Sequence, residues 1–177
     1  MRVAVLVVAA AICLVPQRSE AQRQISMLVA AGVTAVQPGE RTLLGWYFDA
    51  AKSLVPSTAI VGEVGASYHP EAAPYGGERQ VVALGGLRLH FVRRPRAWAF
   101  GQFLVGRGFY RQEFTSFGRF ENSQSGGAVQ LGLGVGLPVN ARWAVQVRAD
   151  ARAVGVGDGI LGGRIFSVGI GRMWGRP

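Results

Sequence analysis

Charged side chains recur at alternate positions of otherwise apolar stretches, and they carry most of the chemistry available to this chain. The clearest examples are Glu63, Arg88, Arg148, Asp150 and Arg152. In an extended strand, a spacing of two places side chains on one face. Buried charges persist only when they are paired, so we predict that these five residues meet inside the fold as an ion-pair network. Residues that extend or bridge the network are expected to be Asp49, Gln102, Gln130 and Gln146.

This network has two interpretations. It can plug the interior of the fold, or it can contain a salt bridge that switches and opens a narrow path for protons, ions or small solutes. Breaking a buried ion pair leaves an uncompensated charge, which is costly. We therefore favour the structural plug and keep the narrow channel as the alternative.

A second set of residues raises the question of hydrolysis. His69 lies in a loop after a predicted strand, Ser67 two residues before it points to the same side, and Glu71 is nearby. Hydrolysis of an acyl ester needs a nucleophilic Ser beside a His that a carboxylate orients. A His followed by Pro70 is more typical of a turn, and His90 has no Ser partner in the sequence. We predict no catalytic residue, with a lipid A-modifying enzyme as the competing hypothesis.

Sites for metals or cofactors are not predicted. Cys13 is the single cysteine, and the Gly-rich stretches do not lead into a helix as a nucleotide-binding loop would. A long connection over 108–127 is instead rich in aromatic and Arg residues, a composition that recognition surfaces use. Its candidates for binding a surface ligand are Phe109, Tyr110, Arg111, Phe114, Phe117, Arg119 and Phe120. Extensions of the flanking strands are the alternative structure for this stretch.

The elements that position these residues are most clearly seen in the stretch 128–153. Apolar residues occupy every second position from Val129 to Val139, and Gly, Ala and Gln lie between them. After a turn at Pro138 to Ala141 the alternation resumes from Trp143, with Arg148 and its charged neighbours on the other face. Two strands of about 11 residues joined by a tight turn form an antiparallel hairpin.

The remaining chain divides into similar pieces, which gives eight strands in all. The other six are expected over 25–36, 43–52, 58–68, 78–91, 98–107 and 164–174. Both faces of 98–107 are apolar, and we place Gln102 inward and Phe103 and Val105 outward. Short turns follow the second, fourth and sixth strands, whereas long or Gly-rich connections follow the third, fifth and seventh. This asymmetry is typical of an up-and-down barrel of the outer membrane.

The polarity of the faces favours lipid over water as the surroundings. A soluble barrel is apolar inside and polar outside, whereas here the charged positions share a face with Gly and Gln. An apolar outer face on most strands would be far larger than soluble monomers tolerate. Aromatic residues expected to form interfacial girdles are Trp46, Tyr68, Trp98, Phe109, Tyr110, Trp143 and Trp174.

The N-terminus has the pattern of a signal peptide. Arg2 precedes an apolar run from Val3 to Val15, and Ser19 and Ala21 are small residues at the positions that a cleavage site requires. We expect residues 1–21 to be removed and residues 22–177 to form the barrel, without cysteine. The formal net charge of +9 falls to +8 when Arg2, Arg18 and Glu20 leave. Because the Arg residues are dispersed, contact with anionic lipid fits better than contact with nucleic acid.

At this level of detail the chain resembles the small eight-stranded outer-membrane β-barrel proteins, OmpA-like or OmpX-like and often labelled porin family. The residues that carry the resemblance are Gly45-Trp46, VGEVGASY at 61–68, AFGQFLVG at 99–106, GLGVGLPVNARWAVQVRADAR at 132–152 and RIFSVGIGRMW at 164–174. The family commonly ends on an aromatic residue that the barrel-assembly machinery reads, whereas Gly175-Arg176-Pro177 follow Trp174 here.

These observations predict an all-β protein: an eight-stranded antiparallel up-and-down transmembrane β-barrel after a cleaved signal peptide. The expected location is a bacterial outer membrane, and the expected role is structural or in surface interaction, without catalysis, cofactor or metal. Expected partners are outer-membrane lipid, lipopolysaccharide and, from the resemblance, the barrel-assembly machinery. We expect a monomer and no nucleic-acid partner.

Overall fold

The computed structural model describes residues 25–38, 42–69, 75–94, 96–114, 120–157 and 159–175. For residues 75, 76, 113, 114 and 120–122 it describes the backbone and not the side chains. The predicted signal peptide lies outside these ranges. Within them, no helix combines the length and the hydropathy that crossing a membrane requires.

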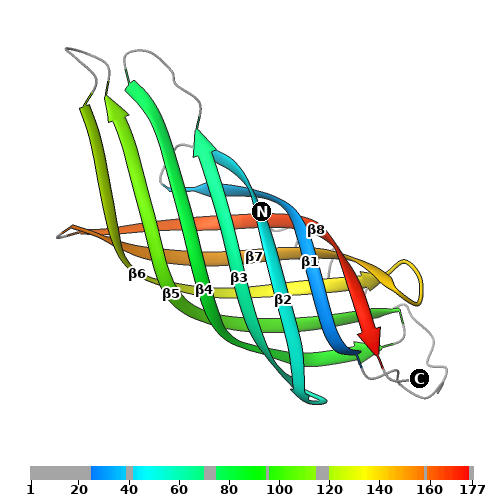
Figure 1. Ribbon diagram of the computed structural model, residues 1–177. Helices are drawn as coiled ribbons and strands as arrows, with labels where there is room; N and C mark the ends of the chain where they lie inside the picture. The colour runs from blue at the N-terminus through cyan, green and yellow to red at the C-terminus, as the bar shows by residue number, and fades with distance from the viewer. Residues whose placement is uncertain are drawn as a thin grey trace, which may run out of the picture.

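Eight antiparallel strands form one closed barrel in which each strand pairs with its neighbours in sequence and β8 pairs with β1 (Figure 1). Their bounds are β1 Ile25–Gln37, β2 Leu43–Val55, β3 Thr58–His69, β4 Tyr75–Arg94, β5 Ala97–Phe114, β6 Phe120–Pro138, β7 Trp143–Val156 and β8 Gly159–Gly175. The predicted fold class is confirmed. Closure satisfies both edges of the sheet, which is the condition for β-structure in lipid.

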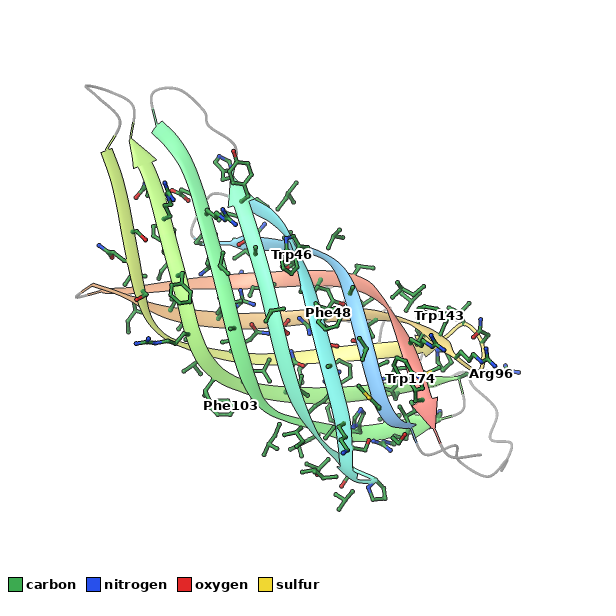
Figure 2. The ribbon with its side chains drawn as sticks, viewed as in Figure 1. Trp46, Phe48, Arg96, Phe103, Trp143 and Trp174 are labelled. Atoms are coloured by element: carbon green, nitrogen blue, oxygen red, sulfur yellow. The ribbon has the colours of Figure 1, made fainter. Side chains whose placement is uncertain are left out.

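Side chains alternate between the lumen and the outer surface along every strand. On β6, Leu131 and Leu133 are more than 60% exposed, whereas Gln130 between its outward neighbours is completely buried. On β5, Gln102 is buried and Phe103 is exposed, so the predicted orientation of that strand is correct. Figure 2 shows Trp46, Phe48, Phe103 and Trp143 projecting from the outside of the barrel. The outer surface is therefore the apolar one.

The two ends of the barrel differ. We call the end that carries Ile25 and Gly175 the terminal end, and the opposite one the distal end. Short connections at the terminal end join β2 to β3, β4 to β5 and β6 to β7. In the last of them, the Asn140 side-chain oxygen accepts the N–H groups of Arg142 and Trp143 at 2.8 and 2.9 Å. An Asn that bonds the backbone in this way fixes a tight turn.

Strands at the distal end are longer than the sequence pattern predicts. β5 runs to Phe114 and β6 begins at Phe120, so most of the expected loop over 108–127 is a strand pair. The expected Gly-rich loop over 155–163 is a tight hairpin between β7 and β8, in which Gly157 has a φ of +55°. Only Gly adopts this backbone geometry readily. As Figure 1 shows, β4, β5 and β6 protrude beyond β7 and β8.

Two of the predicted girdle residues are not on the outer surface. Trp98 is only 4% exposed and lies in the lumen near the terminal end, where Gly136 on β6 leaves space for its indole ring. Tyr110 is half-buried and shares the inward parity of Gln102 on β5. The predicted outer-surface position of Trp98 is wrong because both faces of the stretch 98–107 are apolar, so the alternation does not distinguish inside from outside.

Candidate functional site: the lumen ion-pair cluster

The five predicted network residues converge in the middle of the lumen, together with Asp49. Arg148 is at the centre. Its guanidinium lies 2.9 Å from Asp49 Oδ2, 2.8 Å from Glu63 Oε2 and 3.5 Å from Asp150 Oδ2. Arg88 Nη2 lies 2.6 Å from the same oxygen of Asp49, and Arg152 Nη2 lies 3.2 Å from Glu63 Oε1. One connected cluster therefore joins side chains from β2, β3, β4 and β7.

Two glutamines bridge the charged groups, as their positions predict. Gln102 Oε1 accepts from Arg88 Nε and Nη2 at 3.2 and 2.8 Å, and its Nε2 donates to Asp150 Oδ1 at 2.9 Å. Gln130 Nε2 donates to Glu63 Oε1 at 3.3 Å and accepts from Arg152 Nε at 2.7 Å through its Oε1. Each amide uses its donor on a carboxylate and its acceptor on a guanidinium, which is the only orientation compatible with both neighbours.

Aromatic rings cover two of the guanidinium groups. The Arg88 guanidinium lies 4.3 Å from the centre of the Phe100 ring, and that of Arg148 lies 4.3 Å from the Tyr47 ring. Both rings attract cations through their faces. Neither aromatic is among the residues predicted for the lumen network. Tyr47 nevertheless lies two residues before Asp49, and Phe100 lies two before Gln102, so the parity of the strands indicates both.

The formal charges of the cluster cancel. It contains three arginines and three carboxylates, and all six side chains are at most 8% exposed. Isolated charges of this kind are too costly to bury, whereas a neutral and hydrogen-bonded set is tolerated. The cluster therefore acts as a unit: removal of one member leaves its partners as unpaired charges inside the barrel.

Glycines on β6 make room for the large inward side chains of the strands beside it. A Cβ on Gly132 would overlap the carboxylate of Asp150, and one on Gly134 would overlap the ring of Phe100. These positions alternate with Leu131 and Leu133, which face lipid. The Gly residues of the pattern in 132–136 thus have a packing reason that the sequence alone left open.

Gln146 departs from the prediction that it bridges charged groups. Its side chain is completely buried, and among the described residues neither Nε2 nor Oε1 has a hydrogen-bond partner. A buried amide without partners costs about 1–3 kcal/mol.

Replacement of Gln146 by Leu is therefore expected to raise the free energy of unfolding by about 1 kcal/mol, because the volume is kept and the unpaired polar atoms are removed. The measurement is the urea midpoint of the barrel in lipid vesicles, with Gln130→Leu as the matched control. The control removes an amide that bonds two charged residues, so its midpoint should fall. A lower midpoint for Gln146→Leu would mean that this amide is satisfied.

Small cavities lie on either side of the cluster. One of about 10 Å³ is lined by Thr34, Tyr47, Ser67 and Ser167 on the distal side, and another of similar size adjoins His90, Arg93 and Trp98 on the terminal side. A cavity of this size holds about one water. Neither is a passage through the barrel.

Of the three residues of the hydrolase hypothesis the structure describes Ser67 and His69, and no hydrogen bond joins their side chains. Ser67 is buried in the lumen, and its hydroxyl has no hydrogen-bond partner in the described part of the chain. His69 Nδ1 lies 3.1 Å from the carbonyl oxygen of Thr42, and Glu71 lies outside the described residues. No group of three or more His, Cys, Asp or Glu in the described ranges is arranged to hold a metal ion.

The surface-ligand candidates fall on the protruding strands. Phe109 and Arg111 are exposed on the outward face of β5, and Tyr110 points the other way. The side chains of Phe114 and Phe120, and residues Phe117 and Arg119 entirely, lie outside what the structure describes. The described candidates therefore belong to a sheet and not to a loop.

Comparison with known proteins identifies the fold. No family model matches the sequence, and no curated protein matches it. Neisserial surface protein A superposes with a TM-score of 0.65 at 9% identity, covering 85% of this chain and 97% of that one. Ail, the attachment invasion locus protein of Yersinia pestis, gives 0.62 at 14% identity over 85% and 99%. The outer membrane protein AlkL gives 0.50 at 15% identity over 92% and 96%. The fold is that of bacterial outer-membrane barrels, which agrees with the predicted location.

Proposed function

We propose that this protein is a non-enzymatic outer-membrane barrel that binds an extended protein segment. The distal parts of β4, β5 and β6 form what we call the protruding sheet, and the proposed binding site is the free edge of this sheet. The observation that carries the proposal is the length of β6. Its distal residues Phe120–Ser125 pair with β5 on one side, whereas its pairing with β7 begins only at Ala128. In the described part of the chain no strand pairs with the other side of this segment, although the β7–β8 hairpin lies close to β6 at Gly126 and Gln124, next to Gly155 and Gly157.

The lumen does not offer a comparable site. The ion-pair cluster fills its middle, and buried apolar side chains such as Leu84, Leu104 and Val154 pack on the distal side of the charged residues. This packing supports a structural plug in preference to the narrow channel. The function then depends on the surface of the barrel.

The free edge is suited to pairing with another chain. Six residues extend about 20 Å along a strand and expose backbone N–H and C=O groups in one row, which an added strand can bond. Natural edges are commonly protected by Lys, Pro or a bulge. Between Ser123 and Gly127 the edge has only Ser, Gln and Gly, and the β5–β6 ladder has no register shift.

The protruding sheet is expected to stand clear of the membrane. A strand tilted by about 40° rises about 2.5 Å per residue along the barrel axis, so the roughly ten residues from Ala97 to Arg107 span the apolar band of about 25 Å. Gly108–Phe114 then lie beyond it. Arg79 and Arg107, exposed on the outward face, would meet the phosphates of lipopolysaccharide, the lipid partner that we propose.

The direction of the edge N–H groups follows from the hydrogen-bond ladder. Val139 N donates to Trp143 O at 2.8 Å, so the odd-numbered residues of β6 bond toward β7. In an antiparallel strand, successive residues bond to opposite sides. Ser123 and Ser125 therefore direct their N–H groups to the free edge, and Gln124 directs its own to β5.

This geometry gives a direct test. A library of displayed ten-residue peptides is selected on the folded barrel in lipid nanodiscs, and binding of the selected peptides is compared among variants. Ser123→Pro with Ser125→Pro removes two edge donors and leaves the β5 ladder intact, so binding should weaken at least about tenfold. Ser123→Ala with Ser125→Ala removes the hydroxyls and keeps the donors, so binding should be unchanged.

A second variant removes the whole sheet extension. Gly108 and Gly126 are paired, and the N–H of the even-numbered Gly126 bonds toward β5, so replacing residues 109–125 by Asn-Gly closes the hairpin with a two-residue turn of the preferred type. This barrel should fold and bind none of the selected peptides. Peptides that bind the shortened barrel equally well, or the Pro variant as tightly as the natural chain, would contradict edge pairing.

A further inference from the structure

Basic side chains gather at the terminal end of the barrel, opposite the protruding sheet. Four of them are exposed, and we call them the basic collar: Lys52, Arg96, Arg142 and Arg172. Lys52 and Arg172 lie on the outward faces of β2 and β8, and the other two lie in the turns between β4 and β5 and between β6 and β7. Figure 2 shows Arg96 at the same end as Trp143 and Trp174.

Acidic side chains do not balance this collar in the described part of the chain. Asp49, Glu63 and Asp150 are committed to the lumen cluster, and Glu78 is buried near the distal end. A set of basic groups without local acids creates a positive potential that attracts anions. Within the described residues the collar therefore has no acidic counter-charges.

Arg172 shows which surroundings the collar meets. It occupies the lipid-facing parity of β8, between Phe166, Val168 and Ile170 on one side and Trp174 on the other. Its cross-strand partners are Trp143 on β7 and Val29 on β1, and its guanidinium lies 5.0 Å from the centre of the Trp174 ring.

Trp143 and Trp174 are both about 40% exposed, at 40% and 39%. Indole rings at this position mark the depth of the lipid headgroups, and long basic side chains extend to the same depth. The guanidinium of Arg172 is therefore held at the level of lipid phosphates.

Lys52 reaches the same level from the neighbouring strands. Met27 on β1 pairs with Trp174 on one side and with Lys52 on the other. Two strand spacings, about 10 Å, therefore separate the β8 and β2 positions. Arg142 is fixed close to Trp143, because its carbonyl oxygen accepts the N–H of Met173 at 2.7 Å and Asn140 holds the turn. The collar is thus built on strands and on a constrained turn.

We propose that the basic collar binds the phosphate groups of anionic phospholipids in the membrane leaflet at the terminal end. Arg supplies paired N–H donors that match phosphate oxygens, and Trp143 and Trp174 pack against the upper acyl chains. This lipid site is separate from the protruding sheet. The proposal depends on the barrel lying in a bilayer, and it does not depend on binding at the sheet edge.

Quenching of tryptophan fluorescence by brominated lipids tests the proposal. The barrel carrying Trp46→Phe is folded into phosphatidylcholine vesicles that contain brominated phosphatidylglycerol or, separately, brominated phosphatidylcholine. Trp98 is buried in the lumen and away from lipid, so Trp143 and Trp174 report the lipid at the collar. Phosphatidylglycerol should be enriched there about fivefold, a factor typical of one basic residue at an anionic surface.

Two variants with the same loss of charge separate a site from a general charge effect. Arg96→Gln, Arg142→Gln and Arg172→Gln together leave Lys52 as the one charged member of the collar and should lower the enrichment by at least about half. Arg79→Gln, Arg107→Gln and Arg164→Gln, on β4, β5 and β8 toward the distal end, should leave it unchanged. Equal losses in both triple variants, or no loss in the collar variant, would overturn the proposal.

Folding of every variant is checked by its heat-dependent electrophoretic mobility, which a closed barrel shows whether or not it prefers a lipid. The natural collar gives an independent measurement. Raising the salt from about 0.05 M to about 0.5 M shortens the screening length to a few ångströms, so the enrichment should fall at least twofold. An enrichment that ignores salt would also overturn the proposal, while leaving edge pairing by the protruding sheet untouched.

Discussion

Replacement of Asp49 by Leu is expected to lower the free energy of unfolding of the barrel by about 3–5 kcal/mol, the cost of removing one partner from a buried ion pair. One Asp49 oxygen contacts both Arg88 and Arg148. Among the described residues Arg88 then keeps Gln102 and Phe100 as partners, and the neutral cluster gains a net positive charge. The measurement is urea unfolding in lipid vesicles, followed by tryptophan fluorescence.

The partner of Asp49 provides the control. Asp49→Leu combined with Arg88→Leu restores the charge balance, so the double variant should regain part of the lost stability even though it lacks a further polar group. Glu63→Leu should also lower the unfolding midpoint, because Arg148 and Arg152 both contact Glu63. Unchanged midpoints for both single variants would contradict the network.

Replacement of Gly134 by Val is expected to destabilise the barrel by about 1–3 kcal/mol through overpacking of the lumen. A Cβ at this position would enter the space of the Phe100 ring, whose Cε1 and Cε2 atoms would lie 2.9 Å away. Phe100 cannot retreat freely, because it is fully buried and the Arg88 guanidinium covers it. Urea midpoints and the mobility shift on heating report the effect.

Gly62→Val is the matched control for Gly134→Val. Gly62 lies on the lipid-facing side of β3, and a Cβ there would meet nothing within 4 Å. The same chemical change should therefore be neutral or slightly stabilising, because Val also favours a strand. Similar losses in both variants would mean that strand flexibility, and not space for Phe100, determines the role of Gly134. A second substitution, Phe100→Ala, should relieve part of the damage in the Gly134 variant.

The protruding sheet marks one limit of the sequence pattern. The alternation in 98–107 and 128–139 predicts strands where one face is apolar and the other small or polar. Beyond Arg107 and before Gly127 the alternation of apolar and polar residues fades, so the stretch resembles a loop. The β5–β6 ladder nevertheless continues from Arg107↔Gly127 to Phe114↔Phe120, because backbone hydrogen bonds do not require apolar side chains.

The sequence by itself determined the number of strands, their antiparallel order and the face on which each clear polar residue lies, because period two fixes the side of a strand on which a residue points. The pattern does not fix how far along the barrel axis each residue lies. Which inward residues meet depends on the register of all eight ladders around the closed ring. The tertiary structure therefore decided that Asp49 lies between Arg88 and Arg148, which are 39 and 99 residues away along the chain. It also decided that Gln146 meets neither charge nor amide, and that Trp98, on a strand with two apolar faces, turns inward where Gly136 leaves space.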